Sequence, residues 1–301
     1  MAHQTTHPHG ERLWKDELVH IERDSSGYHV SPGFRPEIHT LTMDRPLIWL
    51  RKGWSDLRAN PVKAIGYGAL IAVLYGLIVA LALATEFYHV GVQLTAGFVL
   101  LAPLFAVGFY AISQKVEQGR PVRFRDTLSA LRTNHKGLLG MGLLMALLFI
   151  TWLMVSMWAA AFLVESKEEV ALFIGAETFP EFFATLVTSL TLPMVLGYFL
   201  IGFVAVLVAF AFTAVSIPML MDRPETDAIT ALTISWEAVM YNWKPMLWWA
   251  VLIAFFTGIG LALFYVGLAI TMPLLGFATW HAYRDTLGEW RKVEEPQVPY
   301  Y

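Results

Sequence analysis

The chain has 301 residues, of which 56% are hydrophobic and 15% are charged, whereas soluble domains are about 25% charged. This composition, with a mean hydropathy of +0.54, argues against a soluble domain and indicates an integral membrane protein. The formal net charge of −3 and the lack of a basic patch interleaved with aromatic residues argue against a nucleic-acid partner. Because the chain has no cysteine, it has no disulfide, thiolate metal site or thiol nucleophile.

The N-terminal region, residues 1–43, is polar and is predicted to be a mostly disordered cytoplasmic tail. It carries His3, His7 and His9 near its start. Three histidines on a flexible tail are typical of solvated side chains, and the alternative is a metal site without carboxylate or thiol support. We assign no metal ligand and no cofactor to the chain.

A three-part pattern recurs after the tail. In its last copy an apolar run ends at Asp222-Arg223-Pro224, an amphipathic segment follows, and a second apolar run begins. Helical spacing predicts a surface helix for this segment, with Asp222 as its N-cap and Glu225 completing a capping box. The same order starts at Asp44-Arg45-Pro46 and at Gly119-Arg120-Pro121. The apolar stripes of the three surface helices are Leu47, Leu50, Trp54 and Leu57; Phe124, Leu128 and Leu131; and Ile229, Leu232, Trp236, Val239 and Met240.

Three tandem parallel copies predict an all-α membrane protein of six transmembrane helices, arranged as three two-helix repeats. Each repeat begins with a cytoplasmic amphipathic interfacial helix. The membrane domain is expected over residues 44–287, and a C-terminal cytoplasmic tail over 288–301. The predicted spans, about as long as a bilayer requires, are residues 64–84, 94–113, 138–164, 194–221, 246–262 and 266–283.

Two features of the first spans have open alternatives. Small residues recur at every fourth position from Ala64 to Ala84. Such a row is typical of close packing inside one bundle, and a dimer contact is the alternative. Pro103, near the middle of the second span, predicts a static kink, and a working hinge is the alternative.

The longest connection, residues 165–189, is predicted to be an outer acidic loop, because it carries several glutamates and a single lysine. Residues 179–193 are interpreted as an interfacial or a re-entrant piece, and both alternatives stay open. The uncharged run from Phe182 to Met221 is awkwardly short for two full spans. Pro193 is therefore expected to divide it.

The distribution of basic residues predicts the orientation. Apart from Lys167, every lysine and arginine lies in the N-terminal region, in the connections 114–137 and 222–245, or in the C-terminal tail. Six spans put these segments on one face, which the positive-inside rule assigns to the cytoplasm. Both termini are therefore expected to be cytoplasmic.

The predicted spans contain no Asp, Glu, Lys or Arg. An ionisable residue at membrane depth is the usual mark of a proton relay, an ion pathway or a catalytic carboxylate. The sequence also lacks a His-Glu-x-x-His helix and an activated nucleophile, so we predict that the protein is not an enzyme. His281, near the cytoplasmic end of the last helix, is interpreted as an interfacial anchor rather than a haem ligand.

The strongest polar grouping lies at the predicted cytoplasmic helix ends, and it would form if the repeats pack around a pseudo-threefold axis. Ordinary helix caps and charge anchors explain these residues, and a docking face for a partner protein is the functional alternative. Trp54, Pro103, Pro273 and Trp280 are added as packing or partner positions. The grouping itself consists of Asp44, Arg45, Asp222, Arg223, His281, Arg284 and Asp285.

Three stretches are distinctive: RPLIWLRKGWSDL from Arg45 to Leu57, IPMLMDR from Ile217 to Arg223, and MPLLGFATWHAYRD from Met272 to Asp285. They resemble the predicted integral membrane proteins called domain-of-unknown-function family 2189, over about residues 43–287. The resemblance implies a bacterial inner-membrane protein of undetermined activity, and some relatives carry the label of cytochrome c oxidase components. That label does not fit a catalytic subunit, which needs several histidines at membrane depth.

We therefore interpret the chain as a non-enzymatic accessory, assembly or scaffold protein. Its surroundings are the lipid bilayer, and its partners are other membrane proteins, by resemblance a respiratory oxidase. A small-molecule carrier or channel is the alternative, because repeated units with proline-broken helices build many transporters. An intramembrane enzyme is the remaining class. A polar central cavity open to one side would favour transport, and a core closed by Leu, Phe and Trp would not.

Overall fold

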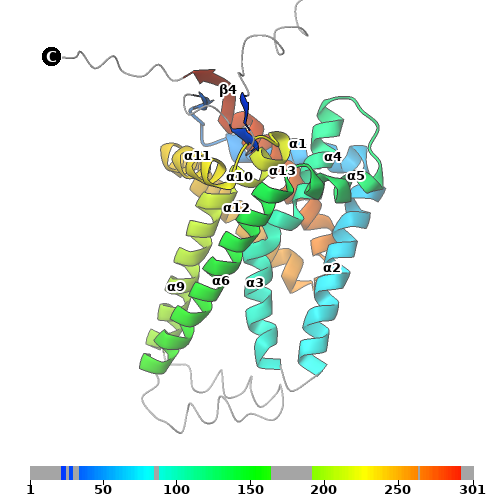
Figure 1. Cartoon of the computed structure of the whole chain (residues 1–301). Helices are drawn as coiled ribbons and strands as arrows, with labels where there is room; N and C mark the ends of the chain where they lie inside the picture. Colours follow the sequence, from blue (N-terminus) through cyan, green and yellow to red (C-terminus); the bar gives the residue numbers. More distant parts are fainter. Residues whose placement is uncertain are drawn as a thin grey trace, which may run out of the picture.

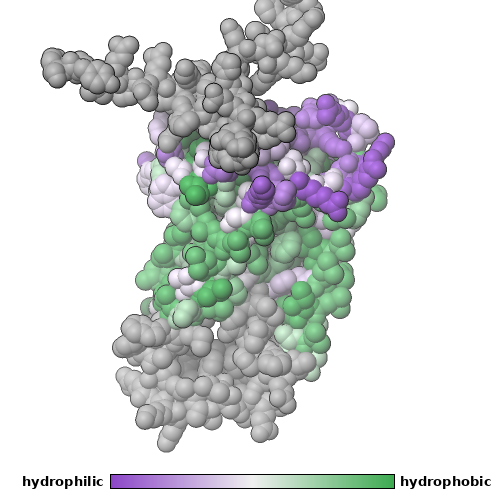
Figure 2. Space-filling view, in the orientation of Figure 1, coloured by the Kyte–Doolittle hydropathy of each residue, from purple (hydrophilic) through white to green (hydrophobic). Residues whose placement is uncertain are grey.

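The computed structural model describes residues 22–24, 27–29, 34–84, 88–163, 192–263 and 265–292. Its long helices run roughly side by side, and short helices and strands gather at one end of the bundle (Figure 1). Figure 2 shows hydrophilic side chains at that end, here called the polar end, and apolar side chains along the bundle. The predicted outer loop, with residues 179–191, and the histidines His3, His7 and His9 lie outside the described residues.

Five of the described stretches are long and apolar enough to cross a bilayer, and the chain is accordingly a multi-pass integral membrane protein. The stretches are Pro61–Ala82, Gly97–Glu117, His135–Val155, Leu200–Asp222 and Trp243–Ala262. The helices that contain them are α2 (Pro61–Ala84), α3 (Tyr88–Phe105) with α4 (Val107–Glu117), α6 (His135–Leu163), α9 (Leu192–Thr213) with α10 (Ser216–Asp222), and α12 (Trp243–Ala262).

The sixth predicted span corresponds to α13 (Leu268–Thr286), which is not among those five stretches. Its last turns are polar because they carry His281, Arg284 and Asp285. The helix packs against α1, α2, α4 and α12, and every residue from Thr271 to Trp280 is buried. The helix is therefore the central packing element of the polar end.

Three predicted surface helices lie at the polar end (Figure 1). They are α1 (Arg45–Ala59), α5 (Phe124–Ser129) continued by η1 (Ala130–Arg132), and α11 (Ala228–Tyr241). Most of their predicted stripes point away from the protein, while the opposite faces pack inward through small residues such as Gly53 and Ala231. The exposed stripe residues are Leu47, Trp54, Phe124, Leu128, Leu131, Ile229, Trp236 and Met240, whereas Leu57 and Val239 are buried.

The predicted N-cap of the third surface helix is wrong. Asp222 is the last residue of α10, and α11 begins after Asp227. The Asp227 Oδ1 atom accepts hydrogen bonds from the backbone N–H groups of Ile229 (2.9 Å) and Thr230 (3.0 Å). Because Asp227 satisfies the first-turn donors, the carboxylate of Asp222 is available to neighbouring helices.

The helix that contains Pro103 is interrupted. Ala106 separates α3 from α4, three residues after the proline. The carbonyl of Phe105 accepts a hydrogen bond from the hydroxyl of Tyr67 in α2 (3.0 Å), and the N–H of Phe109 donates to the Ala106 carbonyl (2.8 Å). A neighbouring helix thus satisfies backbone that the break would leave unpaired in lipid.

The row of small residues on α2 has two different halves. Ala64 and Gly68 are buried, and a Cβ atom on Gly68 would lie 2.7 Å from the carbonyl oxygen of Ala269 in α13. Gly76 faces open space, and Ala84 is exposed. The small residues in the half of the row nearer the polar end therefore allow close packing inside the bundle, as predicted.

The tails contain strands that the sequence analysis did not predict. Strand β3 (Phe34–Ile38) pairs antiparallel with β4 (Leu287–Lys292), and β1 (Glu22–Asp24) pairs with β2 (Gly27–His29). Strands β1, β2 and β3 lie within the region predicted to be a mostly disordered N-terminal tail, and β4 extends into the predicted C-terminal tail. Sequence pattern did not show the β3–β4 pair, because the two strands lie at opposite ends of the chain.

Candidate functional site

Polar side chains in the last two turns of α13 contact α1. Asp285 Oδ2 accepts a hydrogen bond from Trp49 Nε1 (2.8 Å), and Asp285 Oδ1 lies 3.4 Å from a guanidinium nitrogen of Arg45. One turn earlier, His281 Nε2 lies 2.9 Å from Asp56 Oδ2. Two acid-centred contacts therefore join α13 to the two ends of α1.

The same turns of α13 also reach α4 and α10. Trp280 Nε1 donates to Glu117 Oε2 of α4 (3.2 Å), and the hydroxyl of Tyr283 donates to Asp222 Oδ2 of α10 (2.8 Å). Arg284 lies between the two acids, with its Nε 3.5 Å from Glu117 and a terminal nitrogen 4.0 Å from Asp222. These contacts make α13 the common neighbour of α1, α4 and α10.

Helix α4 completes the arrangement. Gln114 Nε2 donates to Asp222 Oδ1 (2.7 Å), and Ser113 Oγ donates to Asp56 Oδ2. The carboxylates of Asp56 and Asp222 therefore each contact donor groups from two other helices. We call the whole set the polar cluster: Arg45, Trp49, Asp56, Ser113, Gln114, Glu117, Asp222, Trp280, His281, Tyr283, Arg284 and Asp285.

The combination of Ser113, His281 and Asp56 has the residue types of a hydrolase triad but not its geometry. In such a triad the histidine takes the proton of the serine hydroxyl, and the acid orients the histidine. Here both the hydroxyl and the imidazole contact the same oxygen of Asp56, which is only 7% exposed. The serine thus donates to the acid and not to a base that would activate it. Within the described ranges, no three His, Asp or Glu side chains are grouped to hold a metal ion.

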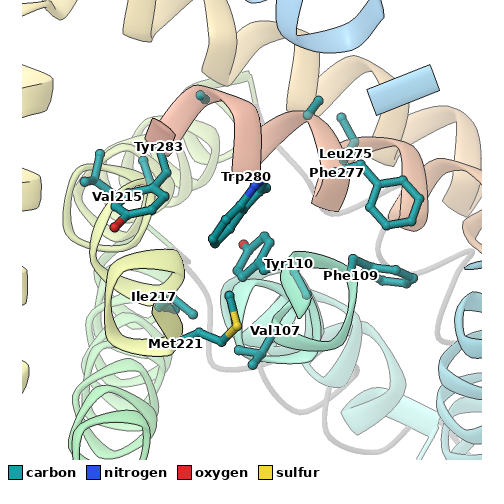
Figure 3. Close-up of a cluster of buried hydrophobic side chains, with 14 of the residues drawn as sticks. Val107, Phe109, Tyr110, Val215, Ile217, Met221, Leu275, Phe277, Trp280 and Tyr283 are labelled. Atoms are coloured by element: carbon teal, nitrogen blue, oxygen red, sulfur yellow. The ribbon is translucent and has the colours of Figure 1, made fainter. Parts of the chain in front are cut away.

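A core of large apolar side chains lies beside the polar cluster, between α4, α10 and α13. Figure 3 shows Trp280 of α13 and Tyr110 of α4 converging in this space, with Met221 of α10 nearby. The Phe109 and Phe277 rings meet edge to face, with their centroids 5.8 Å apart. Trp280, Tyr110, Phe109 and Phe277 are each at most 2% exposed. The space between the three helices is therefore filled by aromatic and aliphatic side chains.

An apolar cavity of about 360 Å³ lies farther along the bundle, between α3, α9, α12 and α13. Phe98, Phe210, Trp249 and Leu275 are among the apolar residues that line it, and Pro103 is another. Among the described residues that line it, the polar side chains are one tyrosine, three threonines and the indole of Trp249. The cavity is thus a space for an apolar occupant.

Six of the predicted site residues meet in the polar cluster: Arg45, Asp222, Trp280, His281, Arg284 and Asp285. Asp44 is exposed at the start of α1, where a hydrogen bond from the Thr42 hydroxyl lowers its pKa. Trp54 is also exposed, with the guanidinium of Arg58 5.3 Å from its ring centre.

The remaining predicted positions have other surroundings. Pro273 is buried on α13, facing Gly68 of α2. Arg223 is the C-cap residue of α10, and its N–H donates to the Met219 carbonyl (2.8 Å). These positions stabilise helix contacts or helix ends.

Sequence reasoning missed six members of the polar cluster: Trp49, Asp56, Ser113, Gln114, Glu117 and Tyr283. A signal for Asp56 exists, because helical spacing places Trp49, Gly53 and Asp56 on one face of α1. An acid on the same face as a buried tryptophan indicates a polar partner within the bundle. The sequence alone does not identify that partner as His281.

Part of the chain matches a known family. Residues 90–222, from α3 to the end of α10, match the family described as "Predicted integral membrane protein (DUF2189)". This confirms the resemblance stated above for the part of the chain that is covered. Comparisons with curated proteins and with solved structures give no match.

Proposed function

We propose that this integral membrane protein, whose residues 90–222 belong to the DUF2189 family, is a non-enzymatic accessory, assembly or scaffold protein of the bacterial inner membrane. The observation that carries the proposal is the mutual pairing within the polar cluster. Asp56, Asp222 and Asp285 each bind donors from another helix. Carboxylates used in this way tie helices together and do not face a substrate. Association with a respiratory oxidase is included only by family resemblance.

The apolar cavity supports this proposal over a carrier for polar solutes. A polar solute that leaves water needs hydrogen-bonding partners along its path, and the cavity walls are almost entirely apolar. At the polar end, Trp280, Tyr110 and Phe109 fill the space between α4, α10 and α13. This is the closed aromatic core expected of a scaffold rather than the polar vestibule of a transporter.

We further propose six spans, with α13 as the sixth, built from three parallel repeats with both termini in the cytoplasm. In each repeat a surface helix at the polar end precedes a long helix, as α1 precedes α2, α5 precedes α6 and α11 precedes α12. The three repeats then end at the polar end with α4, α10 and the last turns of α13, which pack against one another. A reporter fused at Lys167 is expected to be external and one fused at Lys136 internal. A cytoplasmic signal at Lys167 would contradict this topology.

A docking test uses the exposed edge of the polar cluster, because Arg284 is 46% exposed. The full chain is extracted in a mild detergent, separated by native electrophoresis and identified by mass spectrometry. We expect wild type to migrate in a complex, and the double variant Arg284→Ala/Asp285→Ala to lose most of it at equal membrane levels. Lys52→Ala, an exposed change on α1 outside the cluster, is the matched control. Migration of wild type as a single chain in every mild detergent would contradict the proposal.

A further inference from the structure

We propose that the apolar cavity between α3, α9, α12 and α13 is a binding site for one acyl chain of a membrane phospholipid. The inference depends on the protein being embedded in a bilayer and not on its role as a scaffold. Its volume of about 360 Å³ falls in the range of small-ligand sites, about 300–1,000 Å³.

The position of the cavity favours a lipid occupant. Helices α3, α9 and α12, which supply three of its walls, each contain residues of a bilayer-crossing stretch. The fourth wall is the buried part of α13, represented by Leu268 and Leu275. The surrounding medium at this depth is hydrocarbon, so lipid tails are the most abundant apolar molecules available.

The chemistry of the walls favours a tail and not a headgroup. The hydroxyl of Thr213 donates to the carbonyl of Ala209 (2.7 Å), and that of Thr279 donates to the carbonyl of Leu275 (2.8 Å). These two wall hydroxyls are therefore satisfied by their own helices. No lysine, arginine, aspartate or glutamate lines the described cavity, so a phosphate would lack a charged partner. Water would likewise find few partners.

The cavity has a route to the surrounding lipid between α9 and α12. Val206 of α9 is 42% exposed and also lines the cavity, as do the exposed Ala254 and Gly258 of α12. Residues that belong both to the outer surface and to the cavity wall mark its rim. A tail can therefore enter sideways while the headgroup stays in the leaflet.

The test uses the full chain in nanodiscs of palmitoyl-oleoyl phosphatidylcholine, doped with phosphatidylcholine that carries a diazirine near the end of one acyl chain. After irradiation, labelled positions are mapped by peptide mass spectrometry. We expect labels on cavity residues such as Ala209 and Leu275, in addition to outward residues such as Val204. Labels confined to outward residues would overturn the proposal, and this readout needs no variant.

A pair of substitutions on α9 then separates the cavity from the outer surface. Ala209→Phe fills the cavity, because Ala209 lines it and is 6% exposed, whereas Val204→Phe changes a residue that is 51% exposed. We expect at least a fivefold loss of cavity labelling in the first variant and no loss in the second. Thr257→Leu on the α12 wall is the alternative filling variant if Ala209→Phe does not fold. Unchanged cavity labelling in a folded filling variant would contradict acyl-chain binding.

Discussion

The polar end and the membrane-depth half of the bundle are stabilised in different ways. The stretch Gly97–Glu117 reaches into the polar end through α4, and 61% of the residues in its most apolar part are buried within the protein, whereas the corresponding share in His135–Val155 on α6 is 22%. At the polar end, aromatic side chains and hydrogen bonds between helices fill the interior. Farther along the bundle, apolar side chains face outward and a cavity remains between helices.

This difference follows from the surroundings of each region. In lipid, exposing leucine costs little, because the hydrocarbon is as apolar as the side chain, so helices there gain little from hiding apolar surface. At the polar end, water competes for every donor and acceptor, and burial there brings a hydrophobic gain. The polar end should therefore carry most of the stability of the fold, while the membrane-depth half should tolerate substitution and bind lipid.

The largest effect is expected for Trp280→Ala. Trp280 is 1% exposed and donates to Glu117, and removing a buried tryptophan costs about 3–5 kcal/mol of unfolding free energy. Phe255→Ala is the control, because Phe255 is 60% exposed and lies inside the bilayer-crossing stretch of α12. Unfolding by dodecyl sulfate in mixed micelles measures both. Equal losses for the two variants would remove the proposed distinction between the regions.

The next effect is expected for Asp56→Ala. The change leaves His281 and Ser113 without their shared acceptor, and losing a buried hydrogen bond to a charged group costs about 1.5–3 kcal/mol. Asp56→Asn keeps an acceptor oxygen and should lose less. The same unfolding measurement compares them, with Asp44→Ala as a control at an exposed acid preceding the same helix. A larger loss for Asp44→Ala would show that Asp56 is not a tie between α1 and α13.

Two glycine-to-alanine substitutions, each of which adds one methyl group, compare the packing of the two regions. A Cβ atom on Gly53 of α1 would lie 2.8 Å from the backbone nitrogen of Ala278, so Gly53→Ala should cost about 1–3 kcal/mol through overpacking. A Cβ atom on Gly76 of α2 would meet no neighbouring group within 4 Å, so Gly76→Ala should be neutral or gain up to about 1 kcal/mol of helix propensity. Thermal denaturation in detergent should place the two variants on opposite sides of wild type. A melting temperature for Gly53→Ala at or above that of wild type would contradict the close α1–α13 contact.

The sequence predicted the elements of both regions better than the contacts between them. Apolar runs and helical spacing indicated the long helices and the surface helices α1, α5 and α11, because these signals are local. The N-cap at Asp227 was missed because an equally good capping pattern at Asp222 competes with it. Asp222 instead binds Gln114 and Tyr283, and such partners depend on how helices pack, which local spacing does not reveal.

The smallest effect is expected where water reaches the contact. Lys115 Nζ lies 2.7 Å from Asp126 Oδ2, with side-chain exposures of 30% and 13%, and removing such a pair by Asp126→Asn should cost about 0.5 kcal/mol at neutral pH. Partial burial acts to raise the pKa of Asp126, but hydrogen bonds from Lys115 and from the Arg123 N–H outweigh it, so the pKa is lowered from 3.8. The ion pair therefore stabilises the fold above pH 3.8, and this contribution disappears as the pH falls through the lowered pKa.

The gap in melting temperature between wild type and Asp126→Asn should accordingly close in acid, whereas the gap for Trp280→Ala should remain as long as the protein stays folded. A gap for Asp126→Asn that persists at the lowest pH tolerated by the fold would contradict this expectation. It would mean that protonated Asp126 stabilises the fold as much as ionised Asp126 does. The α4–α5 junction would then resemble the buried polar cluster more than a solvated surface pair. The Lys115–Asp126 contact would then count among the buried contacts that stabilise the polar end.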